Sequence, residues 1–328
     1  MSTFIVVSSL LSPALHVGAA EPMPLADVRT FMFQFQGLDS RGAIQRLAET
    51  DYDMLIIDDL HSAKGGESVD MGDIVRKLRL RRPNRVVLAY LDIGAVESDR
   101  FYWQKPWRPA TASVPGSPEF ILTTNSRGWD DTFPAAFWDK RWQQIVATGE
   151  SSALRRTMAA GFDGLVLDWI DSHAEPRVVA EAKRQGVDPA REMVDLVSRV
   201  RDEARRIRPG ARVVAMNGIY LAAEQPKFID LIDGILVEST WFSGKGDVSW
   251  SSGDGGDIPN NVSAPFSTEA RLRQYQKYRD AGRPVFSVDY CLKPEHAADV
   301  YRRARGAGLV PLVTRTSLGG ITTTPPSR

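Results

Sequence analysis

The chain has 328 residues, with 41 Lys or Arg and 41 Asp or Glu, so its formal net charge at pH 7 is zero. This balance argues against a general nucleic-acid binder or a membrane-surface protein, because both need an excess of basic residues. Cys291 is the only cysteine, which excludes an intramolecular disulfide and a cysteine metal cluster. The four histidines lack the spacing of a zinc motif, and we expect neither a metal ion nor a cofactor.

Residues 1–20 have the pattern of a secretory signal peptide. Apolar residues dominate 4–17, and three small residues at 18–20 form a cleavage site before Glu21. The segment lacks Lys and Arg, so a frayed N-terminus is the alternative, and it is too short and too interrupted to span a membrane. We therefore expect a secreted or periplasmic protein with one domain at 21–321 and a disordered tail at 322–328.

From residue 30 onward, short apolar runs alternate with amphipathic segments. The apolar runs predict strands at 30–35, 53–58, 85–91, 164–167, 212–216, 235–237, 284–288 and 309–314. The amphipathic segments predict helices at 40–50, 70–82, 139–160, 189–207, 268–281 and 296–306.

Eight strands that alternate with helices predict an α/β fold, a single-domain (β/α)8 TIM barrel. A doubly wound open sheet is the alternative. It is less favoured because no GxGxxG follows the first strand and no GxxxxGK[ST] occurs in the chain. Long inserts at 93–138 and 243–266 both follow strands, so in a barrel they lie together on the catalytic face.

Two of the predicted strands end in a carboxylate. The run 164–167 is followed by Asp168, and the run 235–237 by Glu238. Side-chain alternation along a strand points both acids into the barrel mouth, and one intervening strand puts the two strand ends about 10 Å apart. Two inward-leaning carboxylates at that separation can flank one glycosidic bond. A lone Asp after a strand is often only a helix cap, but the second matched acid favours a site.

Polar and aromatic residues also follow most of the other strands. Each has a structural explanation as a cap, a turn, an ion pair or loop packing, but their recurrence at strand ends indicates a binding cleft. The acids give that cleft a negative potential despite the neutral total charge, and the aromatic rings suit stacking on sugars. The predicted substrate-binding residues are Asp58, Tyr90, Asp92, Glu97, Arg100, Trp103, Trp169, Asp171, Asn217, Trp241 and Tyr290.

Several of these motifs together resemble glycoside hydrolase family 114, the endo-α-1,4-polygalactosaminidase-like proteins. The motifs are FQFQG at 33–37, YLDIGAVESDRFYW at 90–103, GFDGLVLDWID at 161–171, NG at 217–218 and the strand that ends at Glu238. The resemblance runs from about residue 30 to residue 315. The chain departs from the family at Asp92, where Ser is usual, and at Ala95, where an acid is usual.

The resemblance implies a secreted TIM-barrel glycosidase that cleaves polysaccharide containing α-1,4-linked galactosamine. It places the catalytic pair at Asp168 and Glu238, as the nucleophile and the general acid/base of a retaining mechanism. The expected partner is therefore a polysaccharide or oligosaccharide of cationic amino sugars, with no nucleic acid and no membrane span.

Three other functions remain open at this stage. A non-catalytic carbohydrate-binding barrel would use the same rim, although it would be expected to lose one of the two carboxylates. A hydrolase acting on a different glycan would keep both carboxylates. A magnesium-dependent hydrolase would use the aspartate cluster, whereas zinc is disfavoured because histidines do not follow the predicted strands.

Overall fold

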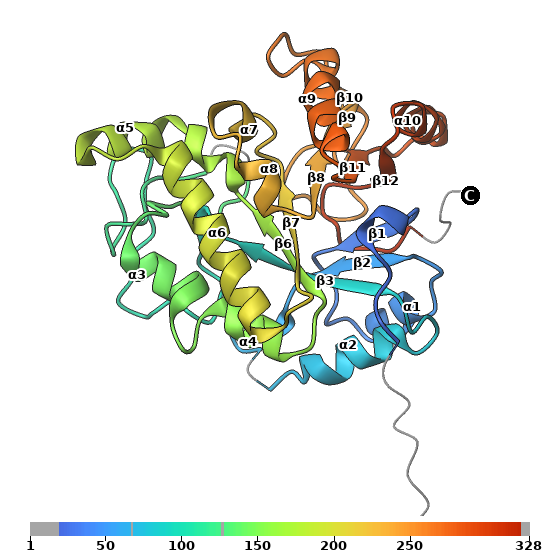
Figure 1. Ribbon diagram of the computed structural model, residues 1–328, viewed down its shortest axis with the longest axis horizontal. Helices are drawn as coiled ribbons and strands as arrows, with labels where there is room; N and C mark the ends of the chain where they lie inside the picture. Colours follow the sequence, from blue (N-terminus) through green and yellow to red (C-terminus); the bar gives the residue numbers. More distant parts are fainter. Residues whose placement is uncertain (1–19, 67, 126–127, 323–328) are drawn as a thin grey trace, which may run out of the picture.

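The computed structural model describes residues 20–322 apart from 67 and 126–127, so the predicted signal peptide and most of the predicted tail lie outside the described residues. Eight parallel strands form one sheet in the order β1-β2-β3-β6-β7-β8-β11-β12 (Figure 1). They are β1 Phe31–Gln34, β2 Met54–Ile57, β3 Val86–Asp92, β6 Gly164–Asp168, β7 Arg212–Met216, β8 Gly234–Glu238, β11 Val285–Tyr290 and β12 Val310–Thr314.

The sheet curls until β12 lies beside β1, which makes the predicted TIM barrel. Four of the eight strands are buried at every residue, and the other four, β6, β7, β8 and β12, at all but one end residue, because helices cover the outside of the sheet and side chains fill its inside. The seam between β1 and β12 differs from the other strand contacts. Among the described residues it has no ladder, and Phe35 N and Gln36 N donate instead to the Leu318 carbonyl at 2.9 and 3.3 Å.

Helices follow the strands and cover the barrel. They are α1 Ala43–Ala48, α2 Met71–Arg79, α3 Lys140–Gln143, α4 Ala153–Ala159, α5 Pro176–Gln185, α6 Pro189–Ile207, α7 Leu221–Glu224, α8 Phe228–Leu231, α9 Thr268–Asp280 and α10 Pro294–Gly306. Short 3-10 turns occupy Leu25–Asp27, Leu60–Ser62 and Ile170–Ala174.

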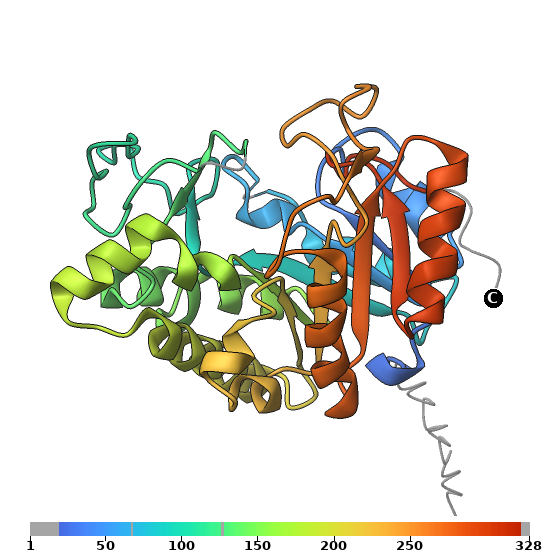
Figure 2. The same ribbon diagram turned by 90° about the horizontal axis from the view of Figure 1, so that it is seen from above.

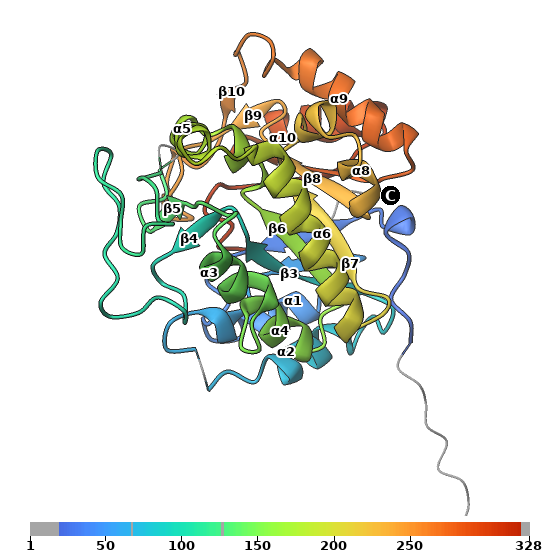
Figure 3. The same ribbon diagram turned by 60° about the vertical axis from the view of Figure 1, so that its left-hand side comes forward.

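The longest of these helices, α6, shows how the sequence sets an element. Asp188 caps it by accepting from Ala190 N and Arg191 N, and Pro189 supplies the preset first residue. Buried residues recur at helical spacing and form an apolar stripe that includes Met193, Leu196, Val197, Val200 and Ala204. Figures 1 and 3 show α6 on the outside of the barrel beside β6 and β7.

One predicted helix was wrong. The segment 139–160 is not continuous: α3 passes into a π-helical turn at Gln144–Thr148, and α4 starts afresh at Ala153. Gly149 ends the turn, where an added Cβ would lie 2.5 Å from the Gln144 carbonyl oxygen, and Ser152 caps α4. The prediction also missed α5, which buries Val178 and Ala182, and the four-residue helices α7 and α8.

Both long inserts lie at the same end of the barrel, as predicted. The first carries an antiparallel pair, β4 Ala95–Glu97 with β5 Thr132–Pro134. The second carries β9 Phe242–Ser243 with β10 Ile258–Pro259. Figure 2 shows the two groups of loops extending beyond the ends toward which the strand arrows point. This end therefore has the loops that can build a binding site.

Candidate active site

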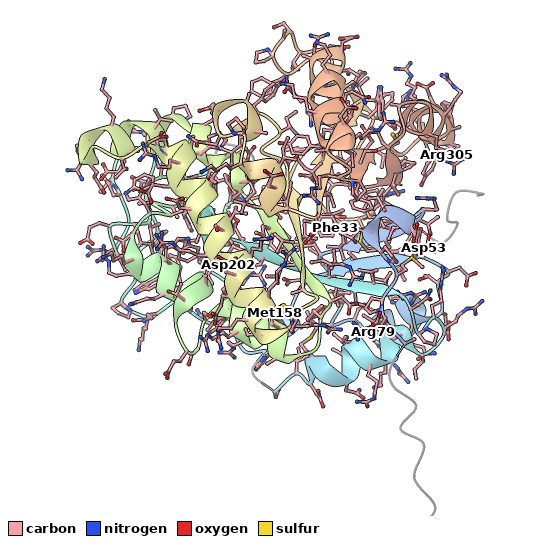
Figure 4. The ribbon with its side chains drawn as sticks, in the orientation of Figure 1. Phe33, Asp53, Arg79, Met158, Asp202 and Arg305 are labelled. Atoms are coloured by element: carbon pink, nitrogen blue, oxygen red, sulfur yellow. The ribbon has the colours of Figure 1, made fainter. Side chains whose placement is uncertain are left out.

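A cavity of about 90 Å³ opens at the C-terminal ends of the strands, beside the first insert. Both predicted catalytic carboxylates, Asp168 on β6 and Glu238 on β8, face it, as the alternation of side chains predicts. Its walls are Phe33 (labelled in Figure 4), Phe35, Tyr90, Glu97, Trp129, Thr132, Asp168, Trp169, Met216, Glu238, Tyr290 and Leu318. We call this space the inner cavity.

The carboxylate of Asp168 is held by one donor on each oxygen. The backbone N–H of Trp169 donates to Oδ1 at 2.6 Å, and the hydroxyl of Tyr90 donates to Oδ2 at 2.8 Å. The Tyr90 hydroxyl can reach Oδ2 because β3 pairs with β6. Their register sets Tyr90 opposite Val166, the inward-facing residue that precedes Asp168 on β6. The two donors fix the plane of the carboxylate, which is what an attacking oxygen needs.

Glu238 is held in a similar way by the strands on either side of β8. Asn217, at the end of β7, donates from Nδ2 to Oε2 at 2.8 Å, and the Tyr290 hydroxyl on β11 donates to Oε1. The amide of Asn217 cannot turn freely, because its Oδ1 accepts from Glu238 N at 3.3 Å. Each of the two acids thus has a tyrosine from a neighbouring strand as one of its donors.

The two acids also interact electrostatically. Burial and then the nearby charge of Glu238 raise the pKa of Asp168 to about 7, although the hydrogen bonds from Trp169 and Tyr90 lower it in part. Burial and the adjacent carboxylates raise the pKa of Tyr90 and Tyr290 well above the usual range, so both stay neutral donors. The inner cavity therefore contains an acid that exchanges its proton near neutral pH.

Left-handed backbone occurs directly after three consecutive barrel strands. Trp169 follows β6 with φ 57°, Asn217 follows β7 with φ 59°, and Ser239 follows β8 with φ 54°. Such a conformation costs a residue with a Cβ about 1–2 kcal/mol, and it concentrates at functional sites. The turn at Trp169 brings its N–H onto Asp168, and the turn at Asn217 brings its amide onto Glu238.

A second group of predicted site residues forms a buried ion-pair network behind one cavity wall. Arg100 donates from Nη1 to Asp58 Oδ1 at 2.8 Å and from Nε to Glu97 Oε2 at 2.8 Å. Glu97 lines the inner cavity, whereas Asp58 and Arg100 do not. The structure thus places Asp58 and Arg100 where they hold Glu97 rather than where they touch a bound sugar.

Asp92 lies beside this network and beside Asp168, its neighbour in the β3–β6 register. Its Oδ1 accepts from Gly94 N and Ala95 N, and its Oδ2 is buried without a hydrogen-bond partner. Burial, and then Glu97 and Asp168, raise the pKa of Asp92 well above the usual range. The raised pKa favours the neutral form of the Asp92 carboxyl over the charged one.

The predicted aromatic residues divide into two groups. Trp169 lines the inner cavity together with Trp129. Trp103 packs against Trp107 and Phe133, with ring centroids 5.6 and 6.0 Å away, inside the layer of the first insert. Trp241 is buried, and its backbone N–H donates to Asp289 Oδ1 at 2.7 Å. The last two positions brace loops and do not line the cavity.

Two predicted residues, Asp171 and Asn217, line a second cavity that borders Glu238.

Sequence reasoning assigned no binding role to several walls of the inner cavity. Phe33 and Met216 stand on strands near their C-terminal ends, a signal that could have found them. Thr132 and Leu318 come from outside the barrel strands, and the sequence carries no signal for them.

Among the described residues, no three His, Cys, Asp or Glu side chains are arranged to hold a metal ion. In the same part of the chain, no helix is both long and apolar enough to cross a membrane.

A TIM barrel whose C-terminal rim presents two carboxylates to one cavity has the architecture of a glycoside hydrolase. The chain belongs to glycoside-hydrolase family GH114, whose family model matches residues 19–327. The resemblance found in the sequence is thereby confirmed, and the protein is a glycosidase with a carbohydrate substrate.

Solved structures agree on the fold. The glycoside hydrolase domain of PelA from Pseudomonas aeruginosa is 17% identical, with a TM-score of 0.58 over 90% of this chain and 97% of that one. Aspergillus fumigatus Ega3, crystallised in complex with galactosamine, is 14% identical, with a TM-score of 0.59 over 93% and 98%. An uncharacterized protein of Deinococcus radiodurans is 29% identical over 242 residues, 74% of this chain and 68% of the relative.

Proposed function

We propose that this glycosidase cleaves polysaccharide containing α-1,4-linked galactosamine, with retention of configuration. The observation that carries the proposal is the pair of inward carboxylates, Asp168 and Glu238, which share one cavity and are each held by two hydrogen-bond donors. Asp168 is the nucleophile and Glu238 is the general acid/base.

In the first step an oxygen of Asp168 attacks the anomeric carbon, and the bond from that carbon to the glycosidic oxygen breaks. Glu238 gives its proton to the departing oxygen. In the second step Glu238, now a carboxylate, takes a proton from water. The water oxygen attacks the same carbon and releases Asp168. The donors on Asp168 suit this role because they orient it and stabilise its anion.

The amino-sugar preference has two supports. The family relative Ega3 was crystallised with galactosamine, and that observation concerns Ega3 itself. In this chain, Asp168 and Glu238 line the inner cavity without a lysine or arginine among its walls, whereas the third acidic wall, Glu97, is paired with Arg100 behind it. A cationic sugar would gain from that potential, whereas a neutral sugar would not.

The test is an assay of the purified protein on α-1,4-galactosaminan, its partly acetylated form and a neutral α-glucan. New reducing ends should appear with the first two polymers only, and NMR should show the α-anomer first. Release of the β-anomer first would exclude retention. Cleavage of the glucan at an equal rate would exclude the amino-sugar preference, and the absence of any cleavage would reject the proposal.

We also propose that the protein is secreted or periplasmic. The support is the apolar run and small-residue site within residues 1–20. N-terminal sequencing of the protein expressed in its source should begin near Glu21. A first residue of Met1 in an intracellular fraction would reject export.

A further inference from the structure

A second and larger cavity adjoins the inner one on the far side of Glu238. Its volume is about 530 Å³, within the range of ligand pockets, and it opens to solvent between the turns after β6 and β7 and the end of the second insert. Among its walls are Asp171, His173, Glu175, Tyr220, Glu224 and Phe266. We call this space the outer cavity.

Glu238 forms the border between the two cavities. Its Oε1 accepts from Tyr290, a wall of the inner cavity, and its Oε2 accepts from Asn217, a wall of the outer one. Asp168, in contrast, lines only the inner cavity. A glycosidic oxygen that takes a proton from Glu238 must lie at this border. The sugar unit attacked by Asp168 is then in the inner cavity, and the leaving unit is in the outer one.

The outer cavity is negative. Asp171, Glu175, Glu224 and Glu238 line it, against one arginine, Arg271. The guanidinium of that arginine is bound to backbone and hydroxyl oxygens: it donates to the carbonyls of Glu238 and Ser239 and to the hydroxyl of Tyr275. The excess of carboxylates favours a cationic ligand.

His173 adds an acceptor that suits the same ligand. The side chain is 4% exposed, and its Nδ1 lies 2.8 Å from the carbonyl oxygen of Ile170, so Nδ1 carries the hydrogen. In the neutral ring Nε2 then has a free lone pair. This atom has no hydrogen-bond partner, and the nearest carboxylate oxygen, on Glu224, is 3.6 Å away. An ammonium group can donate to both.

An aromatic edge completes the outer cavity. Phe266 is 57% exposed, and Tyr220 meets it edge-to-face with ring centroids 5.7 Å apart. Tyr220 is fixed because its hydroxyl donates to the Pro265 carbonyl. The exposed ring face offers a flat apolar area, which suits the C–H face of a sugar ring.

We propose that the outer cavity is the subsite for the leaving sugar unit, and that it selects a unit with a free ammonium group over an N-acetylated one. Glu175 and Glu224 supply the charge that distinguishes the two, and Phe266 supplies packing common to both. The inference rests on the proposed function, since the position of the leaving unit follows from the role of Glu238.

The test compares three substrates with the same galactosamine unit for the inner cavity. The first has a nitrophenyl leaving group, the second a galactosamine leaving unit, and the third an N-acetylgalactosamine leaving unit. In the Glu175→Gln/Glu224→Gln double variant, kcat/KM for the second should fall by about tenfold or more. The first and third should change by less than about twofold. Equal losses on the second and third, or no loss on either, would overturn the inference.

Two further variants separate charge at this cavity from other effects. Glu119→Gln removes one negative charge from a side chain that is 79% exposed and lines neither cavity, so it should leave all three rates unchanged. Phe266→Ala should lower kcat/KM for the second and third substrates alike. A loss confined to one of them would contradict the packing role. A thermal melt of each variant tests whether the fold persists.

If the unaltered protein cleaves none of the three substrates, the proposed function fails and the outer cavity is judged by binding. Calorimetric titration with methyl galactosaminide should then show affinity that the double variant loses and Glu119→Gln keeps. Equal binding by both variants would overturn the inference independently of catalysis.

Discussion

The two ends of the barrel use the same residue types for opposite purposes. Strand β6 is preceded by Asp163 and ends in Asp168, and strand β8 is preceded by Asp233 and ends in Glu238. At the N-terminal end each acid is paired with arginine. Asp163, fully buried, binds Arg79 at 2.7 Å and Arg208 at 2.8 Å. Asp233 likewise binds Arg205 at 2.9 Å.

At the C-terminal end, neutral hydroxyl, amide and backbone N–H groups replace the arginines around Asp168 and Glu238. An arginine partner would keep a carboxylate ionised and its oxygens engaged in an ion pair. Neutral donors orient it and leave its charge and proton available. The buried network of Asp58, Glu97 and Arg100 shows that the same rim can also pair its acids where stability is needed. The partner of each acid, more than the acid itself, therefore determines whether the acid is available for chemistry or contributes to stability.

The largest expected effect comes from removing the proposed nucleophile. Asp168→Asn keeps the shape of the side chain but cannot attack, so kcat/KM on galactosaminan should fall by about 10⁴-fold. Circular dichroism should be unchanged. Activity within about tenfold of the unaltered enzyme would exclude Asp168 from the mechanism.

The same variant should gain stability at alkaline pH. The folded pKa of Asp168 is about 7, against an ordinary value of 3.8, so the folded form binds the proton more tightly. Its stabilising contribution is complete below pH 3.8 and is lost as the pH rises through 7. The free energy of unfolding of Asp168→Asn, relative to the unaltered protein, should therefore be higher at pH 8 than at pH 5. A difference independent of pH would contradict the raised pKa.

The next effect concerns stability at the opposite end. Asp163→Asn leaves Arg79 and Arg208 without their shared carboxylate and weakens the bond from Val87 N. We expect a loss of roughly 3–5 kcal/mol in the free energy of unfolding, measured by urea titration. The matched control is Asp202→Asn, whose side chain is 69% exposed and should show no measurable change. The fraction of Asp163→Asn protein that remains folded should keep its kcat. This result would separate the stabilising role of the N-terminal end from the catalytic role of the C-terminal end.

The pH profile sharpens the comparison further. A nucleophile must be ionised, so kcat/KM should fall about tenfold per unit below pH 7, the pKa of Asp168 in the free enzyme. A bound ammonium sugar favours the carboxylate anion, so the acid limb of kcat should lie at lower pH than that of kcat/KM. A limb near pH 4 in both parameters would show that Asp168 is not perturbed.

The smallest effect is expected for Tyr90→Phe, which removes one neutral donor. The hydrogen bond from Tyr90 lowers the pKa of Asp168, so its loss should move the acid limb to higher pH. We expect kcat to fall about tenfold, the equivalent of one hydrogen bond to a charged group. A fall in kcat without movement of the limb would show that Tyr90 only packs.

The sequence predicted the barrel well because the periodic signals are local. The bounds of α6 and β7 match the predicted ranges, and the other strands agree within two residues at each end. The helix at 139–160 was wrong because a π-helical turn leaves the periodic pattern almost unchanged, while Gly149 and Ser152 alone mark the break. The prediction also passed over α5, and over α7 and α8, whose four residues each are too few for a periodic pattern.

For the site, strand alternation predicted that Asp168 and Glu238 face one cavity. Position at a strand end could not tell which other side chains reach it. Arg100 follows a strand, yet its guanidinium binds Asp58, a partner far away in the sequence. That choice depends on how the inserts pack, which residue order alone does not encode in any local pattern.

The seam between β1 and β12 has a consequence for local motion. Strands without a ladder between them open more easily than paired strands, and their amides exchange with solvent without global unfolding. Phe35 and Leu318 lie on the two sides of the seam and both line the inner cavity. An occupied inner cavity would bridge them, so deuterium uptake at Phe35 and Gln36 should report the arrival of a sugar.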